Sequence, residues 1–160
     1  MTDVRKAAIA IGSNLGNRHA ALAFAAEKLT SLLVNFTLSG IIETWPVGEG
    51  TDRQPLYLNA VATGDTSLTA RELLDLLLGI EQAFGRERPH RNAARTLDLD
   101  LILLGDEVVV EDGLEVPHPR FRERFFVLGP LAEIAGDMVD PVSGARVGEL
   151  LRELLRDEAR

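Results

Sequence analysis

The segment that best indicates the fold reads Thr96-Leu97-Asp98-Leu99-Asp100-Leu101-Ile102-Leu103-Leu104. Its aliphatic run, which lies between Arg95 and Gly105-Asp106, predicts a buried β-strand. Two aspartates interrupt this run. Because alternate residues of a strand share a face, Asp98 and Asp100 should point the same way, about 6–7 Å apart.

Two carboxylates on one face of a strand repel each other, and burying them is costly. A hard divalent cation such as Mg²⁺ relieves this repulsion, and it usually completes its coordination with water and phosphate oxygens. The spacing alone leaves a second interpretation open, in which the aspartates are exposed or pair with arginines.

Basic residues surround the acidic strand on both sides. They are Arg86, Arg88, Arg91 and Arg95 before it, and His118, Arg120, Arg122 and Arg124 after it. Guanidinium groups bind phosphate oxygens in a bidentate manner, while aspartates hold metal ions. This arrangement is typical of a site for a metal-bound polyphosphate.

The composition limits the class of protein. The chain has 160 residues and 46% hydrophobic content, which predicts one compact domain over residues 1–160. It has no cysteine, which excludes disulfides and thiolate metal sites. The net charge of −8 argues against nucleic acid as a partner. We find no signal-peptide pattern and no run long enough for a membrane span, so we expect a cytoplasmic protein without a membrane partner.

The order of predicted elements indicates the fold class. Strands are expected at 7–11, 36–44, 56–62 and 96–104, and helices at 18–33 and 69–85, the second beginning with the capping box Thr69-Ala70-Arg71-Glu72. Val108-Val109-Val110 predicts a further hairpin strand, and short helices are expected near 119–135 and 147–156. The order βαββαβ predicts a ferredoxin-like α+β sandwich, with a mostly antiparallel sheet, helices on a face and a C-terminal extension.

Several motifs together carry a resemblance to a known family. The most specific are Arg95-Thr96-Leu97-Asp98-Leu99-Asp100 and Val116-Pro117-His118-Pro119-Arg120; supporting matches are Ala10-Ile11-Gly12-Ser13-Asn14-Leu15-Gly16, Glu43-Thr44 through Gly48, Tyr57-Leu58-Asn59-Ala60-Val61, Ile80-Glu81, Gly85-Arg86, Glu123-Arg124, Phe126-Val127-Leu128 and Pro130-Leu131. With these, the chain resembles the 6-hydroxymethyl-7,8-dihydropterin pyrophosphokinases, folate-pathway enzymes that move pyrophosphate from ATP to a pterin alcohol.

The resemblance implies roles for the charged residues. Asp98 and Asp100 would bind two Mg²⁺ ions, and Arg86 and Arg95 would act on the triphosphate and on the transferring group. The residues that would contact ATP are Arg86, Arg88, Arg95, His118 and Arg124. Arg120 and Arg122 are equally compatible with surface charge.

The resemblance also implies a pocket for the pterin. Tyr57 and Phe126 would stack on its two faces, although core packing is the commoner role of an aromatic residue in a strand. Asn59 shares a strand face with Tyr57 and offers a donor and an acceptor to the pterin edge. Thr44 and the main chain around Val47 would complete that edge. Trp45 is either a lid residue or an anchor of its loop.

One segment departs from the family pattern. Many relatives carry Trp-Gly-Pro just before the arginine of the aspartate motif, whereas this chain has Asn92-Ala93-Ala94. We expect the loop from Arg86 to Arg95 to close differently over the nucleotide.

The same residues leave two functions from other classes open. A D-x-D nucleotide-sugar transferase also needs a metal on paired aspartates, but the small size and the lack of a parallel βαβ series count against it. The other is a non-enzymatic ferredoxin-like module for a ligand or RNA; the acidic charge and the lack of an aromatic-rich sheet motif count against RNA. We expect a monomer.

Overall fold

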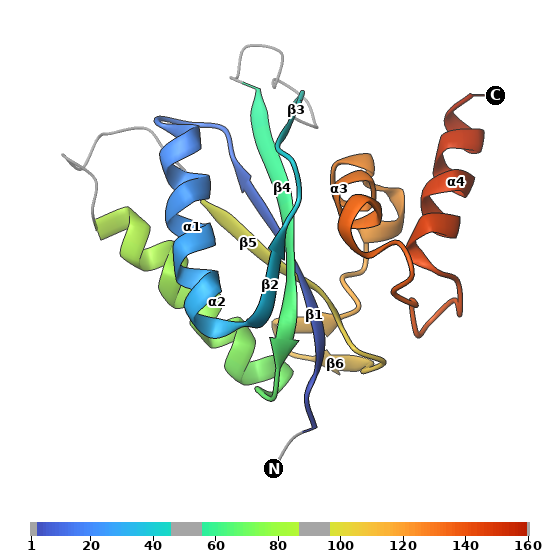
Figure 1. Ribbon diagram of the computed structural model, residues 1–160, viewed down its shortest axis with the longest axis horizontal. Helices are drawn as coiled ribbons and strands as arrows, with labels where there is room; N and C mark the ends of the chain where they lie inside the picture. Colours follow the sequence, from blue (N-terminus) through green and yellow to red (C-terminus); the bar gives the residue numbers. More distant parts are fainter. Residues whose placement is uncertain (1–2, 46–55, 87–96, 160) are drawn as a thin grey trace.

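The computed structural model describes residues 3–45, 56–86 and 97–159 (Figure 1). Its elements, in chain order, are β1 (Arg5–Ser13), α1 (Arg18–Leu32), β2 (Val34–Leu38), β3 (Ile42–Thr44), β4 (Tyr57–Thr66), α2 (Ala70–Arg86), β5 (Asp98–Leu104), β6 (Val109–Glu111), β7 (Leu114–Val116), the 3₁₀-helix η2 (Phe121–Glu123), α3 (Phe125–Ala135) and α4 (Val147–Glu158). Within the described ranges, no helix is long and apolar enough to cross a bilayer.

The main sheet has the strand order β2-β4-β1-β5, and β3 also pairs with β4. Each of these pairs is antiparallel. Strand β1 lies at the centre, with Gly12 opposite Asn59 of β4 on one side and opposite Asp98 of β5 on the other. The prediction of a mixed α and β protein with a mostly antiparallel sheet is therefore confirmed.

The predicted strand over residues 36–44 is instead two short strands, β2 and β3, which pair with different parts of β4. Ser39 lies between them. Its backbone N–H donates to the Val61 carbonyl at 2.9 Å, and its Oγ accepts from the Val61 N–H at 2.8 Å. The next residue, Gly40, donates its N–H to Glu133 of α3 at 2.8 Å. The side chain of Ser39 replaces a strand bond, and this interruption ties the sheet edge to α3.

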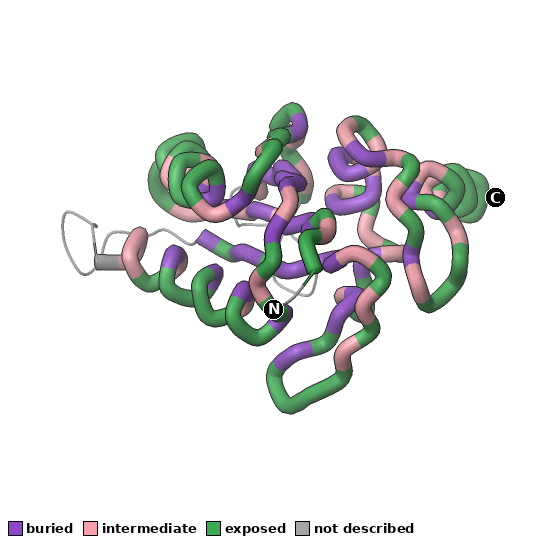
Figure 2. Tube along the Cα trace, turned by 60° about the horizontal axis from the view of Figure 1, so that its bottom comes forward, coloured by how far each residue is buried: buried purple, intermediate pink, exposed green. Residues whose placement is uncertain are grey.

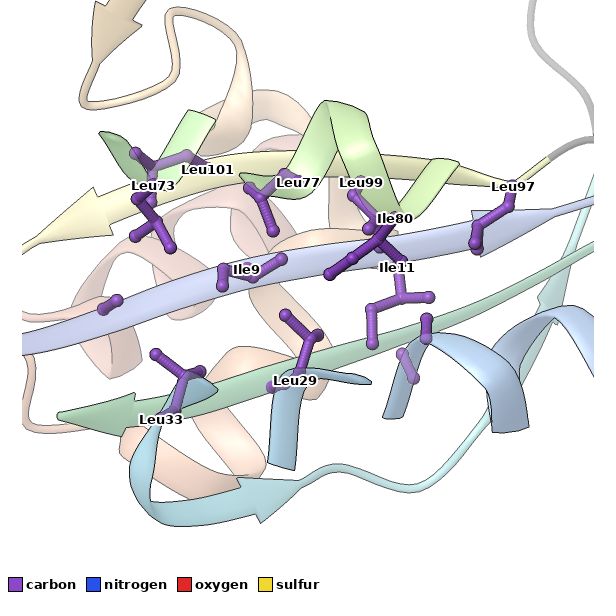
Figure 3. Close-up of a cluster of buried hydrophobic side chains, with 14 of the residues drawn as sticks. Ile9, Ile11, Leu29, Leu33, Leu73, Leu77, Ile80, Leu97, Leu99 and Leu101 are labelled. Carbon is purple, nitrogen blue, oxygen red and sulfur yellow. The ribbon is translucent and has the colours of Figure 1, made fainter. Parts of the chain in front are cut away.

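Helices cover both faces of the sheet (Figure 1). Helices α1 and α2 bury Leu29, Leu73 and Leu77 against Ile9 and Ile11 of β1 (Figure 3). Helices α3 and α4, formed by the predicted C-terminal extension, cover the opposite face. The sequence predicted helices on a face of the sheet and short helices in the C-terminal extension, and the structure places the latter on the opposite face. This second helical layer covers the other apolar side of β1, where Ala8 is buried.

The second face has its own hydrophobic cluster. Phe121, Leu128 and Leu131 are fully buried there against Ala8 of β1 and Val61 of β4. Figure 2 shows buried residues concentrated in the central strands, with exposed residues along the outer sides of the helices.

Helix α2 begins with the predicted capping box. The Thr69 N–H donates to Glu72 Oε1 at 2.9 Å, and the Glu72 N–H donates to Thr69 Oγ1 at 3.1 Å. These reciprocal bonds satisfy free donors of the first helical turn.

The hairpin strand predicted near Val108–Val110 exists as β6, but it pairs with β7 in a separate two-stranded sheet. The two strands are joined at Asp112-Gly113, where Gly113 has a φ of 74°, a conformation that favours glycine. After β7, the His118 N–H donates to the Ile102 carbonyl at 2.9 Å. This bond brings the segment after the hairpin back to β5.

A buried ion pair holds η2 to the connection between α3 and α4. Asp140 is fully buried and accepts bonds from Arg122 Nε, from Arg122 Nη2 at 2.9 Å, from Ser143 Oγ at 2.8 Å and from the Val142 N–H at 3.0 Å. Burial alone would raise the pKa of Asp140, but these hydrogen bonds and the charge of Arg122 lower it to about 2.

We predict that Asp140→Asn lowers the free energy of unfolding at neutral pH by about 2 kcal/mol, because the folded state favours the charged carboxylate. The pKa of Asp140 is depressed in the folded protein, so its contribution is complete above pH 4 and is lost as the pH falls towards 2. Urea unfolding of both proteins across this range measures it. A stability difference that stayed constant down to pH 2 would contradict this account.

Candidate active site

A pocket of about 560 Å³ opens between the sheet and the beginning of α3. Its walls come from the end of β1, the beginnings of β4 and β5, β3 and the segment from η2 into α3. Such a volume is sufficient for a small organic ligand. The pocket contains most of the residues that the sequence singled out within the described ranges.

The floor of the pocket is formed by residues that the strand register places side by side. Asn59, Gly12 and Asp98 form one row across β4, β1 and β5. In the next row, Ala10 lies opposite Asp100. Antiparallel pairing thus places an amide group and two carboxylates on one face, with small residues of β1 between them.

Asp98 and Asp100 are brought together as the alternation of the strand predicted. Both are exposed, and both line the pocket, while Leu99 between them is buried on the other face. Asp98 as a whole is exposed, but its carboxyl group is partly shielded from water in the pocket; this partial burial, followed by the charge of Asp100, raises the pKa of Asp98. This repulsion is what a bound cation would relieve.

The pair of carboxylates suits Mg²⁺. Within residues 3–45, 56–86 and 97–159, no group of three or more His, Cys, Asp or Glu side chains is arranged to hold a metal ion. Mg²⁺ commonly takes only one or two carboxylates from the protein and its other ligands from water and substrate phosphates. The donor set therefore fits a metal that arrives with a polyphosphate.

Two further carboxylates, Glu81 and Glu123, line the pocket, and the sequence motifs gave neither a role. Glu81 lies beside the aspartates. Its Oε2 accepts the Leu99 N–H at 2.7 Å, between the two aspartates. Burial raises the pKa of Glu81, the Leu99 bond opposes this, and the charges of Asp98 and Asp100 raise it further. Its position four residues after the buried Leu77 places it on the apolar stripe of α2, a signal that could have identified it.

The residues expected to bind a flat ring line the same pocket. These are Thr44, Tyr57, Asn59 and Phe126. Asn59 Nδ2 donates to Thr44 Oγ1 at 2.7 Å, which fixes the amide. Burial, with a smaller contribution from the Asp98 charge, raises the pKa of Tyr57, so its hydroxyl is neutral at physiological pH.

Phe126 and Tyr57 come from different layers of the fold, since Phe126 lies in the first turn of α3. The guanidinium of Arg124 lies 5.7 Å from the centre of the Phe126 ring, within cation–π range. Trp45 also lines the pocket and remains 73% exposed.

His118 lies outside this pocket, in an adjacent cleft of about 350 Å³. The cleft is lined by β5, α2, the β6–β7 hairpin and Pro119, and Asp100 lines both cavities. His118 Nδ1 accepts the Arg120 N–H at 3.2 Å, which leaves Nε2 to carry the ring proton. Burial lowers the pKa of His118 against the opposing charge of Asp100.

The flanking arginines take different positions. Arg120 and Arg124 line the main pocket, whereas Arg122 does not line it and forms an ion pair with Asp140. Arg86 is the last residue of α2. The side chain of Arg86 is not among the described parts of the chain. The same holds for Val47, Arg88, Arg91, Arg95 and the segment 92–94, so the contacts predicted for these residues lie outside what the structure describes.

Comparison with known proteins addresses the family directly. The sequence model described as 7,8-dihydro-6-hydroxymethylpterin-pyrophosphokinase (HPPK) matches residues 8–136. The chain belongs to this family. The Haemophilus influenzae 2-amino-4-hydroxy-6-hydroxymethyldihydropteridine pyrophosphokinase is 40% identical in an alignment that covers 94% of this chain and 91% of the relative. The Bacillus subtilis protein of the same name is 41% identical over 88% of this chain and 84% of its own.

Other matches in the HPPK family cover less of the relative. The Synechocystis pyrophosphokinase is 50% identical over 63% of this chain, and the match spans 52% of its length. A crystal structure of wild-type Plasmodium falciparum HPPK-DHPS aligns with 98% of this chain at a TM-score of 0.76 and 12% identity. The aligned part is 46% of that longer protein. At this identity the structural likeness concerns the fold.

We predict that Asp98→Asn raises the thermal stability of the metal-free protein at pH 7, because it removes a partly buried charge that also repels Asp100. The pKa of Asp98 is raised in the folded state, so its charged form costs stability above that pKa. The advantage of the variant should therefore shrink as the pH falls and Asp98 becomes protonated. Thermal melts in a chelator at several pH values measure this. A variant less stable than wild type at pH 7 would contradict the assignment.

Proposed function

We propose that this chain carries out the reaction of its family. It transfers pyrophosphate from ATP to the hydroxymethyl group of 6-hydroxymethyl-7,8-dihydropterin, giving AMP and the pterin diphosphate, a step of folate biosynthesis. The observation that carries the proposal beyond family membership is the pocket itself. One half of the pocket contains Tyr57, Phe126 and the Asn59 amide, and the other half contains Asp98 and Asp100. Strand β1 is the single strand between Asn59 and Asp98.

The pterin is assigned to the aromatic half. Tyr57 and Phe126 stack on the two faces of the ring, Asn59 and Thr44 bind its edge, and the main chain around Val47 completes that edge. The bond between Asn59 and Thr44 supports this assignment, because an amide held in one orientation presents a defined acceptor to the ligand.

The nucleotide is assigned to the cleft beside β5. Its apolar wall, which includes Leu74, Leu101 and Leu114, suits a nucleobase, and His118 with its proton on Nε2 suits a phosphate oxygen. Because Asp100 lines both cavities, the triphosphate can run from this cleft towards the pterin alcohol.

Asp98 and Asp100 are the residues that would hold two Mg²⁺ ions. When bound, these ions would neutralise charge on the transferring and leaving phosphates. Arg86, Arg88, Arg95 and Arg124 supply positive charge and hydrogen bonds to the phosphate oxygens.

The bond changes follow from the products. The pterin alcohol gives up its proton, which is finally released to solvent, and its oxygen forms a bond to the β-phosphorus. The bond from that phosphorus to the oxygen bridging to the α-phosphorus breaks, and AMP leaves with the bridging oxygen. The chain contributes chiefly by positioning both substrates and by stabilising charge.

Three further features are inferred together. The strand order β2-β4-β1-β5, with α1 and α2 on one face, supports the ferredoxin-like arrangement. We also infer one domain over residues 1–160, a monomer and a cytoplasmic location, from the sequence.

Incubation with ATP, Mg²⁺ and the hydroxymethyl dihydropterin tests the reaction. We expect pterin-dependent formation of AMP, and Asp98→Asn or Asp100→Asn should reduce the rate by about two to three orders of magnitude, because metal stabilisation of charge contributes several kcal/mol. Formation of ADP would instead indicate an ordinary kinase. Absence of turnover would favour a binding module, and near-normal turnover in either aspartate variant would refute the metal assignment.

Phe126→Ala tests the position of the pterin. We expect it to weaken pterin binding by roughly 1–3 kcal/mol through lost stacking and buried area, and to leave ATP binding to the free enzyme unchanged. Phe125→Ala is the matched control, since Phe125 is the adjacent ring in α3, is 43% exposed and does not line the pocket. Calorimetry with each ligand measures both affinities. A loss of ATP binding with intact pterin binding would mean that the two substrates are assigned to the wrong cavities.

A further inference from the structure

Gly12 occupies the centre of the pocket floor. It lies near the end of β1, directly between Asn59 of β4 and Asp98 of β5, and it lines the cavity. The residue in the middle of this row separates the group proposed to bind the pterin edge from the carboxylates proposed to hold metal. A side chain there would project from the same face as both.

The backbone of β1 does not require glycine at this position. Gly12 is extended and paired with strands on both sides; among the described residues, the glycines with left-handed φ are Gly16, Gly105, Gly113 and Gly144. Glycine inside a strand weakens it and often marks a place where a ligand or another backbone approaches closely. Conformation therefore does not explain this residue.

Packing within the protein does not require glycine either. A Cβ at Gly12 would lie 3.4 Å from Asn59 Oδ1 and 3.9 Å from Tyr57 Cδ1, which are ordinary contact distances. Gly64, in contrast, would place a Cβ 2.5 Å from the Cβ of Leu33, so packing excludes a side chain there. A methyl group at Gly12 fits the protein and takes up space only in the pocket.

We propose that Gly12 is a specificity-determining position, kept without a side chain so that the flat substrate can lie against β1. One edge of the ring then meets Asn59 while its alcohol arm extends towards Asp98. Two strand spacings, about 10 Å, separate these neighbours, a length that a fused bicyclic ring with a one-carbon arm can span. A side chain would lift the ring from the floor and move the alcohol away from the carboxylates. This inference rests on the proposed function.

The test compares Gly12→Ala with Gly79→Ala. Gly79 is the matched control because a Cβ there, in α2, meets no atom within 4 Å. For each protein the binding of hydroxymethyl dihydropterin and of Mg–ATP, the melting temperature and kcat/KM for the pterin are measured. Gly12→Ala should weaken pterin binding by at least about tenfold, as expected when a methyl group overfills a packed site. Its Mg–ATP affinity should be unchanged and its melting temperature equal or higher, and Gly79→Ala should match wild type in both affinities.

Wild-type pterin affinity and kcat/KM in Gly12→Ala would overturn the inference. A parallel loss of Mg–ATP binding, or a lower melting temperature, would also overturn it, since either would indicate a structural role. Failure of the proposed function has a different signature. Wild type would then bind the pterin without forming AMP, and the ratio of pterin affinities between wild type and Gly12→Ala would still test Gly12. A wild-type protein that binds no pterin would refute both.

Discussion

The antiparallel register of β1 with its two neighbours is the constraint on which the site depends. It aligns Asn59, Gly12 and Asp98 in one row and Ala10 with Asp100 in the next. A shift of one residue in either pairing would turn the side chains of the moved strand to the opposite face. The burial of Ile9 and Ile11 on one side of β1 and of Ala8 on the other opposes such a shift. The hydrophobic core therefore fixes the geometry of the polar groups.

The second half of the site depends on the C-terminal segment. Phe126 and Arg124 reach the pocket because η2 and the beginning of α3 are held close to the sheet. The pair between Arg122 and the fully buried Asp140 ties this segment to the loop before α4. A charge pair remote from the substrates thus supports the position of one wall, which relates the stability of the extension to the shape of the pocket.

The sequence predicted much of the fold because its local signals agree with the final structure. The alternation in 96–104 gave the shared face of Asp98 and Asp100, and the capping box gave the start of α2. The interruption at Ser39 was missed because it depends on a bond to Val61, far along the chain. The partner of β6 was missed for a similar reason, since pairing is decided by turn geometry and tertiary packing.

The site residues that belong to sequence motifs were predictable, whereas residues whose role depends on tertiary packing were harder to predict. Tyr57, Asn59 and Phe126 meet in one pocket as expected. The sequence could not separate Arg120 from Arg122, because both lie in one basic run and only the fold shows that Arg122 faces Asp140. Glu81 received no role because an acidic residue on a helix is usually solvated.

The break between β2 and β3 also affects how this protein meets other chains. An uninterrupted outer strand presents a row of free N–H and C=O groups on which another polypeptide can form a further strand. Here the edge of the sheet is divided into two short pieces, and at the break Gly40 bonds to Glu133 of α3. Among the residues that the structure describes, no long straight template for strand addition is left on this side of β4. The same break that joins the sheet to the helix bearing Phe126 therefore makes this edge of the sheet a poor template for edge-to-edge pairing.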